Sequence, residues 1–298
     1  MTNGPLISII VNCYNGENYL QYALKSVLSQ TYKNWELIFW DNQSNDKSEK
    51  IFHSFKDDRF KYFHASKHTF LYEARNLAIE KSSGQFYTFL DVDDWWVPEK
   101  LEIQIAKFSD KEVGLVYGNY KIFNERKQKS YIATKILKTN NILTNNLLKN
   151  YNVGLLTIMV RSKVFDNISF DSKYHIIGDF DFVIRCSLTW KVESVTDLLA
   201  YYRWHDNNES RKKDYLHTIE VSNWLSNSYI FNLLNKLDGF RYIESINHLN
   251  KMIYFKNNKQ YRKALDELYS IKTLKLKIKG IIFIILPSIF LRLISKYG

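Results

Sequence analysis

Three acidic side chains follow an apolar, aromatic run in the segment Tyr87–Trp96. The run predicts a buried strand, and Asp91, Asp93 and Asp94 come directly after it. Carboxylates at this density repel one another and are costly to bury unless a cation joins them. Mg²⁺ and similar hard cations bind between one or two carboxylates and the phosphates of a substrate. The segment therefore predicts either a metal and diphosphate site or a polar loop, in which Asp93 or Asp94 caps the helix that begins near Pro98.

Strand and helix patterns alternate over residues 1–120, and this alternation helps to decide between a metal site and a capping loop. Apolar runs rich in β-branched and aromatic residues predict strands at 6–12, 35–40, 60–64, 86–90 and 113–117. Strands that alternate with helices indicate an α/β fold with a mostly parallel central sheet flanked by helices. Ligands of such sheets bind beyond the carboxyl ends of the strands. Polar loops follow three of these strands, at 12–15, 41–46 and 91–94, so the acidic segment lies where a ligand is expected.

The second half of the chain is less regular. Its patterns predict a hairpin or flap at 120–138 and a short helix at 140–152. They also predict a strand at 153–160, a helix at 179–190 and a long strand at 192–204. From 215 to 271 the apolar spacing is helical. We therefore expect one domain over 1–213, with a regular part at 1–120 and a less regular part at 121–213. A helical C-terminal extension is expected at 214–271 and a separate tail at 272–298.

Composition indicates a folded protein of a reducing compartment. The chain has 298 residues, 45% of them hydrophobic, with 3 prolines and 10 glycines, which argues against disorder. The two cysteines, Cys13 and Cys186, provide no disulfide framework and no zinc-binding spacing. The first residues lack the basic and apolar regions of a signal peptide. We expect the catalytic part to be cytoplasmic.

Positive charge is concentrated near the C-terminus. Residues 240–298 hold 12 Lys and Arg against 3 Asp and Glu, which places +9 of the net +11 there. Four lysines lie in Lys272–Lys279, and the uncharged run Gly280–Leu291 is interrupted by Pro287. This run is shorter than the roughly 20 apolar residues of a transmembrane helix. We expect peripheral association with the inner face of the cell membrane, with packing of a last helix on the body as the alternative, and no nucleic-acid partner, because no recognition motif accompanies the charge.

Four segments of the first 120 residues have a distinctive order and spacing, Pro5–Asn15, Glu36–Asp46, Ala74-Arg75-Asn76 and Phe89–Asp94. Together they resemble glycosyltransferase family 2, of the type that assembles bacterial surface polysaccharides. The resemblance implies a catalytic domain with a nucleotide-sugar-binding half at 1–120 and an acceptor-binding half at 121–213. Two further segments, Gly178–Phe182 and Tyr202–His205, resemble weaker motifs of the family. The resemblance implies the nucleotide-sugar-binding GT-A fold and an inverting, metal-dependent transfer from a UDP-sugar.

The resemblance also implies a donor site. Tyr14 would pack on the uracil base beside Cys13, Asp41 would accept a hydrogen bond from the base, and Arg75 would contact the base or the diphosphate. Asp91 would contact the ribose or the donor sugar. The full set that the resemblance implies for donor binding is Cys13, Tyr14, Asn15, Asp41, Arg75, Asp91, Val92 and Asp93.

The metal site and the general base are implied in the same way. Asp93 would bind Mn²⁺ or Mg²⁺, and His205 would add a metal or phosphate contact. A metal suits the reaction, because charge develops on the phosphate oxygens of the leaving diphosphate. Asp179 would deprotonate the acceptor hydroxyl, which needs a carboxylate within hydrogen-bond reach. Asp94 is left with the capping role.

The chain departs from the family pattern at several positions. Asn12 stands where the family usually has Pro, and Asp41-Asn42-Gln43-Ser44 stands where it often has Asp-Asp-Gly-Ser. The usual Glu-Asp pair is Gly178-Asp179 here, which leaves Asp179 or Asp181 as the base, with Asp179 preferred. The Gln-x-x-Arg-Trp motif of processive synthases is missing around Arg203. We therefore expect a single addition of sugar to a saccharide acceptor, such as a lipid-linked glycan.

Two other functions are compatible with parts of the pattern. A sugar-phosphate nucleotidyltransferase also uses an α/β sheet and Mg²⁺, but it should carry a glycine-rich phosphate loop, and Cys13–Glu17 contains one glycine. A non-catalytic, membrane-bound nucleotide-sugar-binding protein would keep the donor site alone. The donor sugar, the acceptor, the linkage and the oligomeric state stay open.

Overall fold

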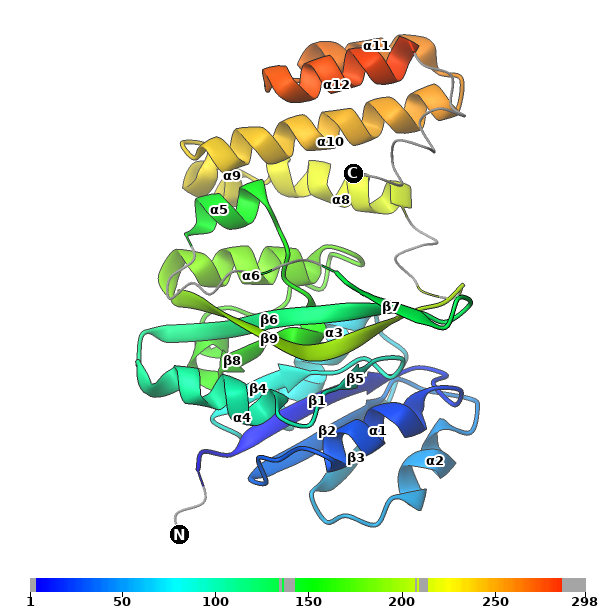
Figure 1. Cartoon of the computed structure of the whole chain (residues 1–298), viewed down its shortest axis with the longest axis vertical. Helices are drawn as coiled ribbons and strands as arrows, with labels where there is room; N and C mark the ends of the chain where they lie inside the picture. Colours follow the sequence, from blue (N-terminus) through cyan, green and yellow to red (C-terminus); the bar gives the residue numbers. More distant parts are fainter. Residues whose placement is uncertain (1–3, 134–135, 137–142, 207, 209–213, 286–298) are drawn as a thin grey trace. The chain divides into compact units, whose positions relative to one another are not determined.

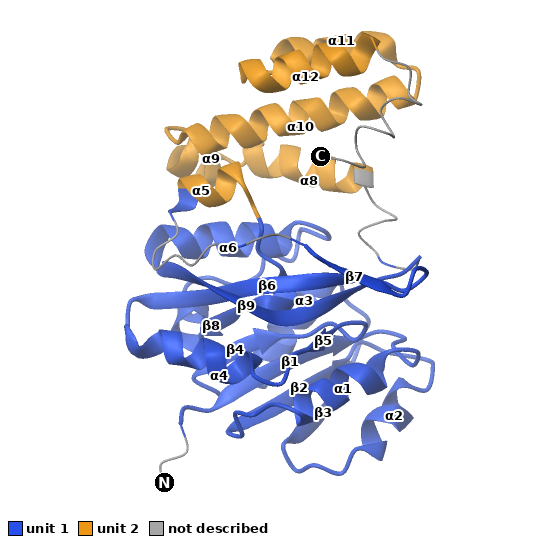
Figure 2. Ribbon diagram, viewed as in Figure 1, with its two compact units in different colours: residues 1–144, 152–208 blue, residues 145–151, 209–298 orange. Residues whose placement is uncertain are grey.

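The structure is a computed structural model, and it describes residues 4–133, 136, 143–206, 208 and 214–285. These residues fall into two compact units, one of residues 1–144 and 152–208 and one of residues 145–151 and 209–298 (Figure 2). The second unit thus includes the short segment 145–151, which the sequence places inside the first domain.

A nine-stranded sheet forms the centre of the first unit (Figure 1). One half is parallel, in the order β3-β2-β1-β4. Its strands are β1 (Ile7–Cys13), β2 (Trp35–Asp41), β3 (Phe60–His64) and β4 (Phe86–Phe89). All seven residues of β2 are buried, as expected of a strand covered on both faces.

The other half of the sheet has mixed strand directions. Its strands are β5 (Trp95–Trp96), β6 (Val113–Asn124), β7 (Lys129–Ile132), β8 (Met159–Arg161) and β9 (Lys191–Trp204). β8 joins the halves, because it pairs antiparallel with both β4 and β6. β6 and β9 run parallel, whereas β5 and β7 pair antiparallel with them. The predicted α/β fold is confirmed, and the parallel pattern is strongest in the N-terminal half.

Helices cover the sheet of the first unit (Figure 1). They are α1 (Leu20–Leu28), α2 (Ser48–Ser54), α3 (Leu71–Ile79), α4 (Lys100–Ile105) and α6 (Gly178–Thr189), with 3-10 helices at Ala106–Ser109, Leu155–Thr157 and Ser162–Asp166. The apolar side of α1 packs into one core cluster with alternate residues of β1. The apolar residues at helical spacing in α1 and at alternate positions in β1 therefore pack into one core.

The strand expected at 153–160 is only partly confirmed, because β8 begins at Met159 and the prediction is wrong over the 3-10 helix at 155–157. The reason lies in the partners of its carbonyl groups. Trp96 Nε1 donates to the Leu156 carbonyl at 2.9 Å, and Gln104 Nε2 donates to the Thr157 carbonyl at 2.7 Å. Side chains thus bind the carbonyl groups that a strand neighbour would otherwise bind.

The hairpin expected within 120–138 is confirmed for the part that the structure describes. β6 and β7 pair from Lys121 opposite Ile132 to Asn124 opposite Lys129. Residues 134–135 and 137–142 lie outside the described residues. The expected short helix is present as α5 (Thr144–Lys149).

The second unit is helical. Its further helices are α8 (Asp214–Ser226), α9 (Ser228–Leu234), α10 (Asp238–Asn257), α11 (Tyr261–Ser270) and α12 (Leu274–Ile285). A separate apolar cluster joins α10, α11 and α12 through Leu249, Met252, Ala264, Ile271 and Leu276. No helix among the described residues has the length and apolar character needed to cross a membrane. Residues 286–298 of the expected tail lie outside the described residues.

Candidate functional site

The three predicted polar loops follow parallel strands whose carboxyl ends lie at one edge of the sheet. Cys13 at the end of β1 lies opposite Asp41 at the end of β2, and Ile10 lies opposite Phe89 at the end of β4. The Asn42 amide donates to the Cys13 carbonyl at 2.8 Å. The loops are therefore brought to one place, as the strand pattern predicts.

The first loop presents an aromatic ring and buries a thiol. Tyr14 is 53% exposed, and its ring centroid lies 4.4 Å from that of His68. Asn15 has a left-handed backbone with φ of 54°, and Ser44 Oγ accepts a hydrogen bond from its amide at 3.0 Å. Cys13 is buried, and this burial raises the pKa of its thiol. Tyr14 is thus the side chain of this loop that is available to pack on a base.

Asp41 is buried and already holds its own loop. Its exposed fraction is 1%. Oδ1 accepts from the Ser44 amide at 2.7 Å, and Oδ2 accepts from the Tyr62 hydroxyl at 2.7 Å. The structure gives Asp41 a role in shaping the loop, and its hydrogen bond to a nucleobase stays a prediction.

Gln43 adopts the backbone conformation that a glycine would favour. Its φ is 67°, in the left-handed region, at the position where the family often has Gly. Its Nε2 donates to the carbonyls of Ser66 at 2.9 Å and Ala65 at 3.3 Å. The side chain therefore binds the neighbouring loop that carries His68, and the loop keeps a shape that a glycine would reach without strain.

Arg75 and Asp91 form an ion pair. Arg75 Nη2 lies 2.7 Å from Asp91 Oδ1, with the arginine side chain 3% exposed and the carboxylate side chain 40% exposed. The guanidinium also lies 5.2 Å over the Tyr72 ring. Arg75 is thus directed at Asp91 and not at solvent, while Asp91 faces outward.

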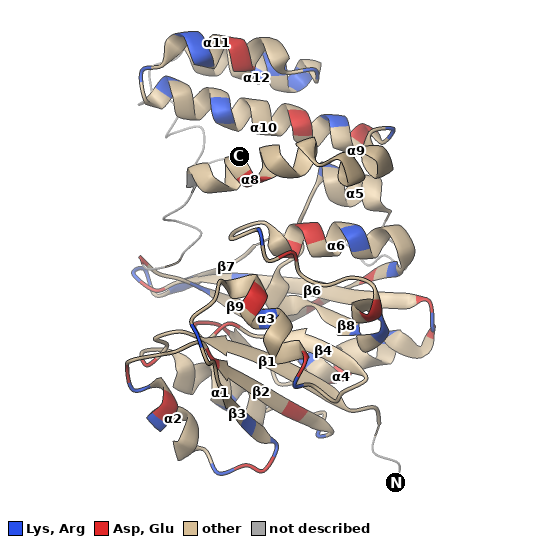
Figure 3. Ribbon diagram, turned by 180° about the vertical axis from the view of Figure 1, so that it is seen from behind, with Lys and Arg blue, Asp and Glu red and all other residues tan. Residues whose placement is uncertain are grey.

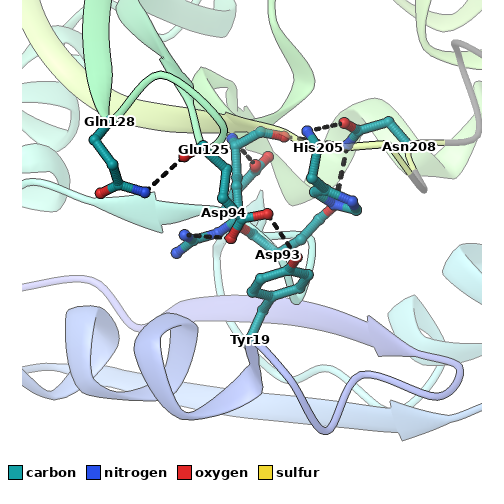
Figure 4. A network of polar contacts seen from close by, with 8 residues as sticks. Tyr19, Asp93, Asp94, Glu125, Gln128, His205 and Asn208 are labelled. Carbon is teal, nitrogen blue, oxygen red and sulfur yellow. Dashed lines mark hydrogen bonds and ion pairs between the residues drawn. The ribbon is translucent and has the colours of Figure 1, made fainter.

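Asp93 lies against His205, although they are 112 residues apart in the sequence. His205 Nε2 lies 3.0 Å from Asp93 Oδ2, and Asn208 Nδ2 donates to the same oxygen at 3.3 Å (Figure 4). A carboxylate oxygen and an imidazole nitrogen that converge in this way are suitable ligands for Mn²⁺, and the carboxylate is suitable for Mg²⁺. The two residues that the resemblance assigns to the metal are therefore neighbours.

Protein ligands alone do not complete a metal site here. Within the described residues, no group of three or more His, Cys, Asp and Glu side chains is arranged to hold a metal ion. This fits the usual mode of Mg²⁺ binding, in which one or two carboxylates and the phosphates of a substrate share the cation. A metal at Asp93 would need oxygen ligands from the donor diphosphate.

Asp94 does not cap the following helix, and this prediction is wrong. Helix α4 starts after Glu99, and no side chain caps its first turn. Asp94 is buried, and its Oδ1 accepts from the Arg203 amide of β9 at 2.8 Å. Burial, and then the charges of Asp93 and Asp91, raise the pKa of Asp94 well above its ordinary value. Asp94 thus attaches the acidic turn to β9.

Asp179 lies in the first turn of α6 and is only partly exposed. Its Oδ1 accepts from the Phe180 amide at 2.8 Å and from the Tyr72 hydroxyl at 3.3 Å. Burial raises the pKa of this carboxyl, and the Phe180 amide, Arg75 and the Tyr72 hydroxyl oppose that rise. Because Asp181 is buried and bonded to Arg185 at 2.5 Å, Asp179 is the better candidate for the base.

Tyr72 occupies the space that a side chain at position 178 would need. A Cβ atom on Gly178 would lie 2.5 Å from Cε2 of the Tyr72 ring. The single proton of the Tyr72 hydroxyl is shared between the Ile176 carbonyl, at 3.0 Å, and Asp179 Oδ1, at 3.3 Å. The glutamate that the family usually has before its aspartate is thus replaced by a glycine and a tyrosine whose hydroxyl reaches Asp179.

Residues missed by the sequence analysis surround Asp93 and Asp94. Arg203 Nε donates to the Asp93 carbonyl at 2.9 Å, and Tyr19 donates through its hydroxyl to Glu125 Oε2 at 2.9 Å (Figure 4). Arg203 lies in the segment Tyr202–His205, which resembles a family motif, and this was the available signal. Tyr19, Glu125 and Asn208 carry no such signal.

The family model of Glycosyl transferase family 2 matches residues 8–183, which contain the loops, the acidic turn and Asp179. The chain belongs to glycosyl transferase family 2. It is therefore a glycosyltransferase, which argues against both the nucleotidyltransferase and the non-catalytic binding protein.

Two relatives from Escherichia coli are named for the same activity, UDP-Glc:alpha-D-GlcNAc-diphosphoundecaprenol beta-1,3-glucosyltransferase. WfgD is 37% identical over 165 residues, which cover 55% of this chain and 64% of WfgD. WfaP is 31% identical over 212 residues, which cover 70% of this chain and 81% of WfaP. The match thus spans less than two thirds of the length of WfgD.

Solved structures with the GT-A fold resemble the chain over most of its length. TarS 1–349 of S. aureus, in complex with UDP-GlcNAc, has a TM-score of 0.61 at 16% identity, over 89% of this chain and 90% of that chain. The mannosyltransferase PcManGT of Pyrobaculum calidifontis, in complex with GDP-Man and Mn²⁺, has a TM-score of 0.59 at 13% identity, over 92% and 78%. At these identities the similarity shows the fold, and it confirms the GT-A expectation.

Proposed function

We propose that the protein transfers one sugar, with inversion, from a UDP-sugar to a saccharide acceptor with the help of Mn²⁺ or Mg²⁺. The observation that carries the proposal is the convergence of Asp93 with His205 at the edge of the sheet where Asp91 and Arg75 also lie. Arg75 forms an ion pair with Asp91, and its positive charge also opposes the rise in the pKa of Asp179. Donor-binding acids and a base therefore belong to one site.

The donor is a uridine nucleotide sugar. The exposed ring of Tyr14 beside His68 is a suitable surface for a planar base. The names of WfgD and WfaP specify UDP-glucose, and TarS was solved with UDP-GlcNAc. PcManGT was solved with GDP-Man, so the fold alone does not select the base. UDP-glucose is the first donor to test.

The metal would stabilise the leaving diphosphate, and the acidic residues would hold the metal and contact the donor. Mn²⁺ or Mg²⁺ at Asp93 and His205 would supply Lewis-acid stabilisation of the departing diphosphate. Asp91, oriented by its ion pair with Arg75, is directed toward the ribose or the donor sugar. The hydrogen bond from the Arg203 amide to the buried carboxyl of Asp94 would hold the neighbouring Asp93 in place.

Asp179 acts as the general base. Its carboxylate accepts the proton of the acceptor hydroxyl while that oxygen forms a bond to the anomeric carbon and the bond from that carbon to the diphosphate breaks. UDP leaves, and one displacement inverts the anomeric centre. The raised pKa of Asp179 brings it closer to the working pH, which favours a base.

The acceptor is a lipid-linked glycan of cell-surface polysaccharide synthesis, reached at the cytoplasmic face of the membrane. Both E. coli relatives are named for an acceptor that carries diphosphoundecaprenol. Helix α12 offers a surface for the same membrane. Its exposed apolar residues recur at helical spacing, at Leu274, Ile278, Ile281 and Ile285.

The opposite face of α12 packs within its own unit. Leu276 and Gly280 are buried, and Phe283 and Ile284 pack against the cluster shared with α10 and α11. Exposed Lys275 and Lys279 accompany the outer apolar stripe, and Lys and Arg segments mark these helices in Figure 3. One helix can thus pack inward and contact an anionic lipid surface outward.

A screen of nucleotide sugars tests the proposed function. Thermal stabilisation of the purified chain by UDP, UDP-glucose, UDP-GlcNAc and GDP-mannose is measured with Mn²⁺ and with EDTA. The expected result is stabilisation by UDP and by at least one UDP-sugar that EDTA removes. Stabilisation by GDP-mannose and not by UDP would contradict the proposed donor, and equal stabilisation in EDTA would contradict the metal.

A further inference from the structure

Arg203 is a buried cation at the end of β9 that touches the acidic turn. Its side chain is 9% exposed. Nε donates to the main-chain carbonyl of Asp93 at 2.9 Å, and Nη1 lies 3.5 Å from Glu125 Oε1. Two nitrogens of the guanidinium thus contact a carbonyl group and a carboxylate of the protein.

Four aromatic rings surround this guanidinium. Its Cζ lies 4.7 Å from the ring centroid of Trp95 and 4.8 Å from that of Tyr19, with Tyr22 and Phe123 at 5.3 and 5.7 Å. Ring faces attract a guanidinium, and the attraction is stronger where water is excluded. The rings come from α1 and its preceding residue, from β5 and from β6, so they hold Arg203 from several elements.

The main chain of Arg203 is bonded to the same turn. Its amide donates to Asp94 Oδ1 at 2.8 Å, and its carbonyl accepts from Asn208 Nδ2 at 3.1 Å. Asn208 Nδ2 also donates to Asp93 Oδ2, and Asn208 Oδ1 accepts from the His205 amide at 2.7 Å (Figure 4). Arg203 therefore links the backbone of Asp93 to the segment that carries His205.

We propose that Arg203 is a positioning residue that sets the distance between Asp93 and His205, and so preorganises the pair for a divalent cation. The inference rests on the proposed function. Two ligands on distant segments bind a cation well only if the protein holds their separation before the cation arrives. Arg203 contacts the segment of Asp93 with its side chain and belongs to the segment that carries His205.

A direct contact of Arg203 with the diphosphate is the competing role. Its contacts within the protein argue against it, because Nε donates to the Asp93 carbonyl and Nη1 forms an ion pair with Glu125. The enclosing rings of Trp95 and Tyr19 also cover the guanidinium. The two roles differ in what they predict for Mn²⁺ binding in the presence of UDP.

The test compares Arg203→Met with Arg161→Met. Arg161 is a matched control in β8, because it also lies over two rings, those of Phe86 and Phe108, and donates to main-chain carbonyls. Mn²⁺ affinity is measured by electron paramagnetic resonance with saturating UDP, and thermal stability is measured in parallel. Arg203→Met should weaken Mn²⁺ binding about 10–100-fold, as loss of a residue that supports metal ligands does. Arg161→Met should stay within about twofold of the wild type.

Arg203→Lys keeps the charge under the rings but loses the planar fork, and it serves if the methionine variant does not fold. It should weaken Mn²⁺ binding by about threefold or more. Wild-type Mn²⁺ affinity at saturating UDP in a folded Arg203 variant would overturn the inference alone. If that variant also needs more UDP for saturation, the result is the one expected of a direct contact with the diphosphate. Absence of Mn²⁺ binding by the wild-type chain with UDP would overturn the proposed function and the inference together.

Discussion

At the scale of single residues, the pair of Tyr72 and Asp179 sets the properties of the proposed base. The Tyr72 hydroxyl donates to Asp179, and this bond favours the ionised carboxylate. Burial acts in the opposite direction and is the larger effect, so the pKa of Asp179 is raised overall. The sequence predicts Asp179, but it cannot predict that Tyr72 fills the space beside Gly178.

Tyr72→Phe should move the acidic limb of the kcat profile to higher pH. The variant removes a hydrogen bond to the charged form of Asp179, so its pKa rises further, and the ionised base is lost at a higher pH than in the wild type. The alkaline side of the profile should change less than the acidic limb, because Tyr72 contacts the base directly. Turnover of the UDP-sugar between about pH 4 and 9 measures it.

Tyr117→Phe is the control for the loss of a tyrosine hydroxyl. Tyr117 is buried and donates to Asn152 Oδ1 at 3.1 Å, and within the described part of the chain no hydrogen bond joins it to Asp179. Its acidic limb should match that of the wild type. A shift to lower pH in Tyr72→Phe, or the same shift in both variants, would remove Tyr72 from the mechanism.

Lys100 is a second residue whose surroundings cannot be predicted from the sequence. It is fully buried on α4, where Nζ donates to Thr88 Oγ1 and Gln104 Oε1 at 2.7 Å each and lies 4.1 Å over the Trp96 ring. Burial lowers the pKa of this amine well below its ordinary value. The folded chain therefore loses this proton at a lower pH than the unfolded chain.

Lys100→Met should flatten the rise of stability with pH. Between the lowered pKa and the ordinary lysine value of about 10.4, the unfolded chain binds one proton more, so the free energy of unfolding rises by up to about 1.4 kcal/mol per pH unit. Urea unfolding at successive alkaline pH values measures the slope. The exposed Lys50→Met is the control, and its slope should equal that of the wild type. An unchanged slope in Lys100→Met would contradict the lowered pKa.

Contacts around Asp93 show where residue-level prediction from sequence ends. The pairing of Asp93 with His205 follows from the family resemblance, since both belong to recognised segments. Asn208 and Glu125 do not, because they come from loops whose sequences carry no motif. Such partners are found only when β6 and β9 are seen side by side.

At the scale of elements, the loop after β2 shows how a departure from the family pattern is accommodated. A left-handed backbone at a non-glycine residue costs about 1 kcal/mol or more. Gln43 offsets this cost through its bonds to Ser66 and Ala65, which tie the two neighbouring loops together. The sequence shows the missing glycine, but not the hydrogen bonds that replace its function.

Gln43→Ala and Gln43→Gly should differ in stability. Both lose the bonds to Ser66 and Ala65, but only alanine keeps a Cβ in the left-handed region. Gln43→Ala should be less stable than Gln43→Gly by about 1 kcal/mol. Urea unfolding at neutral pH measures both. If the glycine variant is the less stable of the two, the strain assigned to Gln43 is absent.

Element types were predictable where the pattern is local and repeated. The strands and helices of the parallel half follow from apolar periodicity, and their order places the polar loops correctly. The local pattern gives the wrong element for residues 155–157, because the side chains of Trp96 and Gln104 bind their carbonyl groups. Those donors lie about 50 to 60 residues away in the chain, so a local pattern contains no information about them.

At the scale of the whole molecule, the proposed catalytic residues and the basic helices belong to different units. The acidic turn and Asp179 lie in the first unit, and α12 lies in the second. The sequence presented membrane binding and packing as alternatives for the tail. The two faces of α12 make them compatible, since the inner face packs in the cluster and the outer face is exposed.

Ile278→Ser/Ile281→Ser should weaken binding to anionic vesicles. Both side chains are exposed on α12, so the change removes apolar area from the proposed membrane surface and leaves the inner face intact. Each isoleucine that enters the interface contributes about 1–2 kcal/mol, so partitioning should fall at least about tenfold. Flotation with vesicles that contain phosphatidylglycerol measures it.

Phe231→Ser/Leu233→Ser is the matched control in the same unit. Both side chains are exposed on α9 and lack the neighbouring lysines of α12. Their loss should leave flotation within about twofold of the wild type. Equal flotation of the α12 variant and the wild type would contradict a membrane role for this face.

The most direct measurement of the central claim compares Asp93→Ala with Asp179→Ala. Turnover of the UDP-sugar and Mn²⁺-dependent binding of UDP are measured for both variants and the wild type. Asp93→Ala should lose turnover and Mn²⁺-dependent binding together, because Asp93 is the proposed metal ligand. Asp179→Ala should lose turnover by about 10²–10⁴-fold and keep UDP binding, because it acts only on the acceptor. Unchanged turnover in both variants would contradict the account.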